Sequence, residues 1–163
     1  MDDGLLQIFT TGGTIDKVYF DARSDYEVGA PEIGRILESV GVTVPYAIET
    51  LMRKDSIDLT DDDRTAILEA VRGADATRVL ITHGTDTIVE TGRVLLQLTN
   101  KTVVLVGSLS PSRFKGSDAE FNIGFALAAA STLPAGVYVA MNGRIFDVRR
   151  VTKNREQNRF EAT

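Results

Sequence analysis

The chain has 163 residues, of which 43% are hydrophobic, enough for one domain with a sizeable core. Its formal net charge of −5 argues against nucleic acid or an anionic membrane surface as a partner, because either would favour a basic patch. The sequence contains no cysteine, which excludes disulfides, thiolate metal sites and cysteine nucleophiles. It shows neither a signal-like N-terminal pattern nor a stretch near the roughly 20 apolar residues of a membrane helix, so we expect a cytoplasmic protein.

The first predicted element is an apolar run that leads into a glycine turn. Residues 5–9 (LLQIF) predict a buried strand, and residues 10–16 (TTGGTID) follow it directly. Gly12 and Gly13 can adopt backbone angles closed to other residues, and they let a ligand approach the main chain. A turn made by glycine alone does not need three threonines around it, which makes this stretch a candidate functional segment.

A polar loop and a short helix come next. Residues 16–30 contain three aspartates and no helical periodicity, so we expect a loop. Pro31 is suited to open a helix over residues 31–40, and Gly41 is suited to end it. The apolar face of this helix is predicted to consist of Ile33, Ile36, Leu37 and Val40.

A strand and a capped helix follow. Residues 43–50 predict a strand, with Pro45 at its start or at a sheet edge. Thr60, three residues before Asp63, indicates a capping box at the start of a helix over residues 61–73. The core-facing residues of this helix are predicted to be Ile67, Leu68 and Val71.

The rest of the chain alternates strands and helices. Residues 78–83 and 102–108 are near-continuous apolar runs, the pattern of strands buried on both faces of a parallel sheet. Helices are predicted at residues 86–98 and 118–132, and a fifth strand at residues 136–143. This alternation predicts an α/β fold with a doubly wound, mostly parallel sheet of the flavodoxin or Rossmann type, flanked by helices.

Doubly wound sheets bind ligands beyond the carboxyl ends of their strands. The segments that leave those ends are rich in Ser, Thr, Asp and Gly, as a small-molecule site would be. They are TTGGTI (10–15), KDSID (54–58), THGTDT (82–87) and GSLSPS (107–112). From residue 144 onward the chain turns polar, and we interpret residues 154–163 as a tail or an interdomain linker.

Several common chemistries lack their motifs. No P-loop is present, and Gly12-Gly13 does not match the glycine pattern of dinucleotide-binding turns. Because His83 is the only histidine, no cluster of histidines and carboxylates has the spacing of metal ligands, and we expect no metal. We interpret His83, at a strand end, as a hydrogen-bonded structural imidazole rather than as the base of a triad.

A threonine nucleophile is compatible with this composition. Such a nucleophile needs a base, and where histidine is scarce a lysine can serve if a carboxylate orients it. Thr85 and Asp86 stand at a predicted strand end, and Lys153 lies in the polar C-terminal region. These residue types allow a Thr–Lys–Asp relay facing a second threonine, although their spacing alone does not bring them together.

Two threonine motifs, TTGGTI (10–15) and ITHGTDT (81–87), in this order and about seventy residues apart, resemble the bacterial-type L-asparaginase family of amidohydrolases. Four further segments resemble the family in the same order. They are SDYEVG (24–29), KDSIDLT (54–60), VVLVGSLSPS (103–112) and FDVRRVTK (146–153). The resemblance implies an enzyme without a cofactor that hydrolyses L-asparagine to L-aspartate and ammonia.

The resemblance also implies a role for each matching residue. Thr11 matches the threonine nucleophile on a flexible loop, and Tyr26 matches the tyrosine that activates it. Thr85 and Lys153 match the second threonine and its lysine partner, and Asp86 matches the aspartate that holds Lys153 and the substrate α-amino group. The remaining implied substrate contacts are Ser56 at the α-carboxylate, with Gly12, Ile57 and Gly84 beside it, and main-chain N–H groups near Gly12 and Thr85 at the oxyanion.

Each of these residues also has a purely structural interpretation. Thr11 could bond its own turn, and Thr85 and Asp86 could cap the following helix. Tyr26 could be a surface aromatic and Lys153 a solvated lysine. The other structural interpretations are helix-start chemistry for Ser56 and Asp58, and solvation for Arg113 and Lys115.

Two features depart from the family pattern. Ile57 stands where many members have a glutamine. Isoleucine cannot make the hydrogen bond to the substrate that glutamine would make, a loss of roughly 1 kcal/mol. The familiar members also carry a second domain of comparable size, whereas this sequence ends at Thr163. We therefore expect one catalytic domain over residues 1–163 without a C-terminal domain, and a homo-oligomer in which a partner copy closes the site to water.

Three functions remain open at this stage. The first is an asparaginase, and the second is a glutaminase or another relative that acts on amides, such as the subunit that supplies ammonia for tRNA amidation. The third is a catalytically silent module that binds an amino acid. The intact set of Thr11, Tyr26, Thr85, Asp86 and Lys153 counts against the silent module, because a binder has no use for the Thr–Lys pairing.

Overall fold

The computed structural model describes residues 4–20 and 25–163. The strands are β1 (Leu6–Gly12), β2 (Lys17–Phe20), β3 (Asp25–Val28), β4 (Tyr46–Lys54), β5 (Arg78–Thr82), β6 (Thr102–Val106), β7 (Gly136–Met141), β8 (Arg144–Asp147), β9 (Val151–Asn154) and β10 (Arg159–Ala162). The α-helices are α1 (Ile33–Ser39), α2 (Asp61–Gly73), α3 (Ile88–Val94) and α4 (Ala119–Thr132). Short 3-10 helices are Thr14–Asp16, Ser56–Asp58, Leu95–Gln97 and Val148–Arg150.

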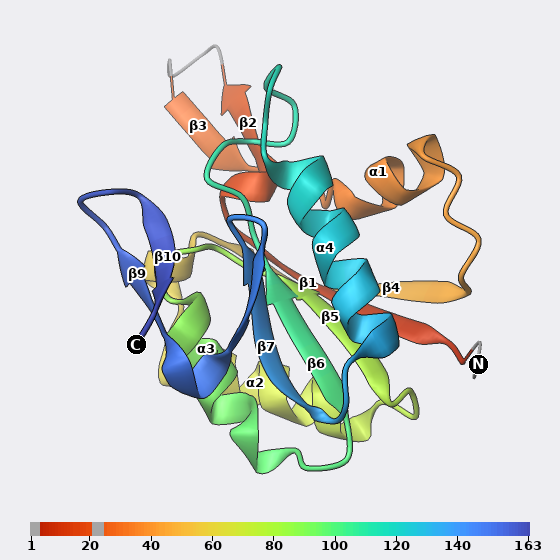
Figure 1. Cartoon of the computed structure of the whole chain (residues 1–163). Coiled ribbons are helices and arrows are strands. Elements are labelled where there is room, and N and C mark those ends of the chain that lie inside the picture. Colours follow the sequence, from red (N-terminus) through yellow and green to blue (C-terminus); the bar gives the residue numbers. More distant parts are fainter. Residues whose placement is uncertain (1–3, 21–24) are drawn as a thin grey trace.

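The predicted fold class is confirmed. The main sheet has six strands in the order β4-β1-β5-β6-β7-β8, and only β8 runs antiparallel to its neighbour. The five parallel strands, taken in chain order, therefore follow the 2-1-3-4-5 arrangement of flavodoxin-like sheets. All five strands expected from apolar runs belong to this sheet, which lies between two pairs of helices (Figure 1).

Two apolar layers hold the sheet to its helices, because alternate side chains of each strand point to opposite faces. On one face Phe9 and Ile81 pack with residues of α2 and α3, and on the other Ile8 and Leu80 pack with residues of α1 and α4. The alanines of α4 let this helix pack close to the sheet, where Ala126 is fully buried. The central strands are thus fixed on both sides, which sets the positions of their carboxyl ends.

Local signals in the sequence locate the helices well. The capping box of α2 is formed as expected, since Thr60 Oγ1 accepts from the Asp63 N–H at 3.1 Å and Asp63 accepts from the Thr60 N–H at 2.9 Å. Ile33, Ile36 and Leu37 of α1 are buried. The expectation for Val40 is wrong: it follows the last residue of α1 and is 63% exposed, because the helix ends before its side chain reaches the core.

Part of the expected loop over residues 16–30 is a two-stranded sheet. Its described residues form β2 and β3, which pair antiparallel with Tyr19 opposite Tyr26, while residues 21–24 lie outside the described part of the chain. Short strands with mixed polar and apolar residues carry no periodicity that sequence reasoning could detect. Figure 1 shows β2 and β3 beside the segment that leads into α4, and the ring of Tyr26 on β3 contacts Phe114 of that segment.

The polar C-terminal region is also ordered as strands rather than as a tail or linker. β8 returns alongside β7 through Asn142 and Gly143, both at positive φ, and forms the antiparallel edge of the main sheet. β9 then pairs with β10, with Lys153 opposite Phe160. Phe160 is buried in the same apolar layer as α2 and α3, so this small sheet is anchored and holds Lys153 in place.

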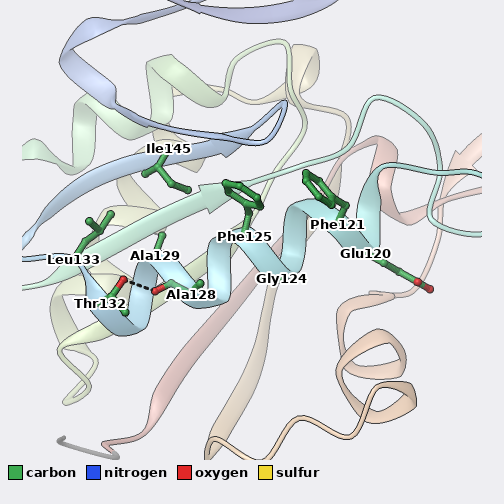
Figure 2. A pocket seen from close by; sticks show the side chains of 9 residues that line it. All are labelled: Glu120, Phe121, Gly124, Phe125, Ala128, Ala129, Thr132, Leu133 and Ile145. Atoms are coloured by element: carbon green, nitrogen blue, oxygen red, sulfur yellow. Dashed lines mark hydrogen bonds between the residues drawn. The ribbon is translucent and has the colours of Figure 1, made fainter.

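The outer side of α4 carries an apolar groove with a volume of about 480 Å³. In Figure 2 the rings of Phe121 and Phe125 project from α4 toward Ile145 on β8, while Glu120 points away at one end. None of the candidate site residues lines this groove. Within the described residues, no helix combines the length and the apolar character needed to cross a membrane.

Candidate active site

The candidate site lies where the strand order of the main sheet reverses. β1 stands between β4 and β5, and the three segments that leave the carboxyl ends of these strands carry most of the candidate residues. They are Thr11 to Gly13 at the end of β1, Ser56 and Ile57 after β4, and His83 to Asp86 after β5. In open α/β sheets the crevice at such a reversal is the usual ligand site. The predicted position of the site is thus the one that the topology favours.

Glycines let these three segments touch main chain to main chain. A Cβ atom on Gly13, whose φ is +90°, would lie 2.4 Å from the Gly84 nitrogen. A Cβ atom on Gly84 would lie 2.6 Å from both Cβ and Oγ of Ser56. Neither position can accommodate a side chain without a shift of its neighbour. The glycines of both threonine motifs therefore bring the turn after β1, the turn after β5 and Ser56 together.

The Thr–Lys–Asp relay that the sequence left open is formed in the structure. Lys153 Nζ donates to Thr85 Oγ1 at 2.9 Å and to Asp86 Oδ1 at 2.8 Å. Only 11% of the Lys153 side chain is exposed, against 38% for Asp86. The capping alternative for Thr85 and Asp86 is wrong, because the N-cap of α3 is Thr87, which makes no side-chain capping bond.

Thr11 lies within β1 rather than on the loop that the resemblance implied. Its side chain is 1% exposed, and Thr11 Oγ1 donates to the Thr82 carbonyl oxygen at 2.8 Å. The hydroxyl oxygen keeps its lone pairs, while its proton is held by the neighbouring strand. Thr10, expected to be a packing residue, is fully buried and donates to Thr50 Oγ1 at 3.1 Å.

Two hydrogen bonds with Thr87 hold Ser56 in the same crevice. The Ser56 side chain is buried, and its Oγ accepts from the Thr87 N–H at 3.3 Å, while Thr87 Oγ1 donates to the Ser56 carbonyl oxygen at 2.8 Å. Ile57, directly after it, is 66% exposed and offers only an apolar side chain there. Thr87 was not among the residues expected at the site, although its place inside the THGTDT segment was the available signal.

The ring of Tyr26 contacts aromatic side chains. It lies on β3, is 44% exposed, and its ring makes edge contacts with Tyr19 at 5.4 Å and Phe114 at 5.6 Å between ring centroids. Among the residues that the structure describes, no hydrogen bond joins Tyr26 to Thr11. Among these described residues, Tyr26 is thus not joined by a hydrogen bond to the group formed by Thr11, Ser56, Gly84, Thr85, Asp86 and Lys153.

His83 is a structural imidazole, as expected. It is fully buried, with Nδ1 2.7 Å from the Gly84 carbonyl oxygen and Nε2 2.8 Å from Thr91 Oγ1. A carbonyl can only accept, so Nδ1 donates, and in the neutral imidazole Nε2 then accepts from the Thr91 hydroxyl. Burial lowers the pKa of His83 to about 4, against an ordinary value of 6.5. The imidazole therefore stays uncharged near neutral pH and fixes the turn at Gly84.

A second missed contact ties the base of β2 to the Ser56 segment. Lys17 Nζ and Asp55 Oδ2 form an ion pair at 2.7 Å, with about a quarter of each side chain exposed. Burial raises the pKa of Asp55, but the hydrogen bond and the charge of Lys17 outweigh it, so the pKa is lowered. Lys17 and Asp55 lie far apart in the sequence, so no local sequence pattern indicated that they pair.

Asp86 and Lys153 also line a small polar cavity. It has a volume of about 200 Å³ and is lined further by Glu90, Arg93 and Arg155. Water and small solutes can therefore reach the Lys153–Asp86 pair. Within the described part of the chain, no group of three histidine or carboxylate side chains is arranged to hold a metal ion.

Comparison with known proteins gives a consistent result. Residues 5–162 match the family model described as "Asparaginase, N-terminal". The glutaminase-asparaginase of Acinetobacter glutaminasificans is 32% identical over 90% of this chain and 48% of its own length. A protein of Haemophilus influenzae named probable L-asparaginase periplasmic is 32% identical over 91% of this chain and 46% of its own length. The chain thus spans about half the length of the curated relatives that it matches.

Solved structures show the same likeness. The thermostable L-asparaginase from Thermococcus kodakarensis superposes with a TM-score of 0.81 at 30% sequence identity. The match covers 98% of this chain and 51% of the other. The architecture described above is therefore that of one half of a known longer chain.

Proposed function

The chain belongs to the asparaginase family, as a match to its N-terminal domain, and from this premise we propose that it hydrolyses the side-chain amide of L-asparagine to L-aspartate and ammonia. The observation that carries the proposal is the Thr85–Lys153–Asp86 relay at the sheet reversal. A hydroxyl joined to a lysine that a carboxylate orients is an arrangement for moving protons. A module that only binds an amino acid has no need of it.

We assign the nucleophile to Thr11. In the first step Thr11 Oγ1 bonds to the amide carbon, the carbon–nitrogen bond breaks, and the nitrogen leaves as ammonia with the proton that Thr11 gave up. In the second step water attacks the acyl-enzyme, releases aspartate and returns a proton to Thr11. The contact between Gly13 and Gly84 supports this assignment, because the end of the strand that carries Thr11 there meets the turn that carries Thr85.

The relay is proposed to move the protons in these steps. A protonated Lys153 must first give up a proton before it can take one from Thr85. Asp86 Oδ1, 2.8 Å from Lys153 Nζ, is positioned to accept that proton. The cavity beside Lys153 and Asp86 supports exchange with solvent. We assign the developing oxyanion to main-chain N–H groups near Gly12 and Thr85.

Substrate recognition is assigned to the rim of the same crevice. Ser56 is proposed to bind the α-carboxylate, and Asp86 the α-amino group. The buried position of Ser56 and the partly exposed carboxylate of Asp86 support these roles. Ile57 has no polar atom on its side chain, so the substrate is held there with one hydrogen bond fewer than a glutamine would give.

A glutaminase is the second candidate function. One relative at 32% identity is named a glutaminase-asparaginase. The apolar side chain of Ile57 could also change the preference between the amides of L-asparagine and L-glutamine. We further propose a homo-oligomer, since Ile57, directly after Ser56, is exposed where a partner copy would exclude water. The expected cytoplasmic location remains a prediction, and one relative is named periplasmic.

Ammonia release from L-asparagine and from L-glutamine, with calorimetric binding of both amino acids alongside, tests the proposal. We expect ammonia release with a higher kcat/KM for L-asparagine. A higher kcat/KM for L-glutamine would establish the second candidate instead. Binding of either amino acid without ammonia release would refute both and establish a silent binding module.

A further inference from the structure

Asp16 closes the segment that carries Thr11, and the activity proposed above gives it no role. It is the last residue of the 3-10 helix Thr14–Asp16 and is 2% exposed. Its carbonyl oxygen accepts from the Gly29 N–H at 2.7 Å, and its Oδ1 accepts from the Glu32 N–H at 2.9 Å. One residue therefore holds both ends of the segment that follows β3 against the turn after β1.

Glu32 extends this contact to a third part of the chain. Its side chain is almost completely buried, and its two oxygens accept from Arg35 Nε at 2.6 Å and from Arg113 Nε at 2.8 Å. Arg113 lies on the segment between β6 and α4 and was expected to be merely solvated. Its neighbour Phe114 makes the edge contact with the ring of Tyr26.

These contacts form a closed circuit. From Asp16 it runs through Glu32 and Arg113 to Phe114 and the ring of Tyr26, and β3 leads back from Tyr26 to Gly29 and the Asp16 carbonyl. Tyr26 is therefore held from both sides, by its own strand and by Phe114. Both supports begin at the residue that ends the Thr11 segment.

The environment of Asp16 favours an uncharged carboxyl group. Burial, with the nearby charge of Glu32, raises the pKa of Asp16 to about 7, against the lowering effects of the Glu32 N–H and of Arg53 on β4. Other charged groups near Asp16 are paired with one another: Arg35 and Arg113 bind Glu32, and Lys17 binds Asp55. Among the described residues Asp16 Oδ2 is buried without a hydrogen-bond partner, and burial of a full negative charge without such partners is more costly than burial of a neutral carboxyl group.

We propose that Asp16 is a positioning residue that, through Gly29, Glu32 and Arg113, sets the place of Tyr26 relative to Thr11. The proposal rests on the amidohydrolase activity proposed above and on the role that the family resemblance implies for Tyr26, the activation of Thr11. It assigns no contact with the substrate to Asp16. Ionisation of Asp16 beside Glu32 adds a second buried negative charge, loosens the circuit and reduces the rate.

The first test is a double-mutant cycle between Asp16→Ala and Tyr26→Phe, measured as kcat and KM for ammonia release. We expect Asp16→Ala to lower kcat by about tenfold or more with a much smaller change in KM, because misplacement of a reacting group acts on the chemical step. In the Tyr26→Phe background the same change should cost less than about twofold. An equal loss in both backgrounds would overturn the proposal, because Asp16 would then act independently of Tyr26.

The second test uses Asp16→Asn, which keeps the shape of the side chain and cannot ionise. Since the neutral form of Asp16 is the competent one, wild-type kcat should fall as the pH rises through about 7, and Asp16→Asn should retain activity and lose this decline. The same decline in both proteins would contradict the proposal. This variant serves if Asp16→Ala does not fold.

Hydrogen exchange of residues 25–32 tests the circuit without any activity. Arg113→Gln breaks the contact with Glu32, and Lys115→Gln, on the same exposed segment, is the matched control. We expect faster exchange in Arg113→Gln than in Lys115→Gln, and equal exchange would overturn the circuit. If the wild type releases no ammonia, the proposed function fails, and this exchange result alone decides whether Asp16, Glu32 and Arg113 hold the segment.

Discussion

Lys153 Nζ lies 2.9 Å from Thr85 Oγ1, although 68 residues separate the two. Asp86 completes the arrangement at 2.8 Å from the same ammonium group. The pairing depends on two structural devices. The parallel sheet fixes the turn that carries Thr85, and the β9–β10 sheet, anchored by buried Phe160, presents Lys153 to it.

Replacement of Lys153 by Met tests whether this pairing serves the reaction. The variant keeps the length of the side chain and removes its proton-carrying nitrogen, so we expect ammonia release to fall by about 10²- to 10⁴-fold. Lys115→Met, at an exposed position without a role in the site, should retain wild-type activity. Activity of Lys153→Met within about twofold of the wild type would show that the relay is structural.

Gly84→Ala tests the close packing of the crevice. The added methyl group would lie 2.6 Å from Ser56 Cβ and Oγ, so Ser56 or the turn after β5 must move. We expect a loss of about 1 to 3 kcal/mol of unfolding free energy, typical of overpacking, together with a higher KM. Both are measured by urea unfolding and steady-state kinetics.

The matched control for this change is Gly124→Ala. Gly124 lies in the middle of α4, and a Cβ atom there has no neighbour within 4 Å. Alanine should therefore stabilise the protein by about 0.5 to 1 kcal/mol and leave KM unchanged. Equal behaviour of the two variants would contradict the packing argument.

The resemblance and the apolar pattern together account for most of the fold and for the members of the relay. Runs such as residues 78–83 and 102–108 are buried on both faces, and burial of this kind is visible in the sequence without knowledge of the neighbours. The capping box at Thr60 is likewise a local signal. The scarcity of histidine made Lys153 a candidate base, but only the family resemblance paired it with Thr85.

Features that depend on distant contacts could not be predicted in the same way. β2, β3, β9 and β10 are four residues each, and their pairing rather than their periodicity makes them strands. The sequence around Arg113 indicates an exposed, solvated arginine. Its ion pair with the buried Glu32 is seen only in the folded structure. The exposed position of Tyr26 has the same origin, because β3 and Phe114 determine it.

His83 predicts a pH dependence of stability. Its folded pKa of about 4 lies below the ordinary 6.5, so the unfolded chain binds the extra proton more readily. Stability from this residue is therefore complete above about pH 6.5 and is lost as the pH falls toward 4. At about pH 5 the loss should be on the order of 2 kcal/mol relative to neutral pH.

The difference between wild type and His83→Gln isolates this contribution from other titrating groups. In urea unfolding the wild type should lose its advantage over the variant as the pH drops from about 7 to 5. A constant difference across this range would mean that His83 is not the neutral, buried imidazole described above.

The most direct test of the account is ammonia release from L-asparagine by the wild type, Thr11→Ala and Thr10→Ala. The adjacent Thr10 is the matched control, because it is equally buried and its hydroxyl donates to Thr50 of the neighbouring strand. We predict that the wild type and Thr10→Ala release ammonia and that Thr11→Ala, still folded, does not. Full activity in Thr11→Ala would contradict the assignment of the nucleophile, and no release by the folded wild type would contradict the proposed reaction itself.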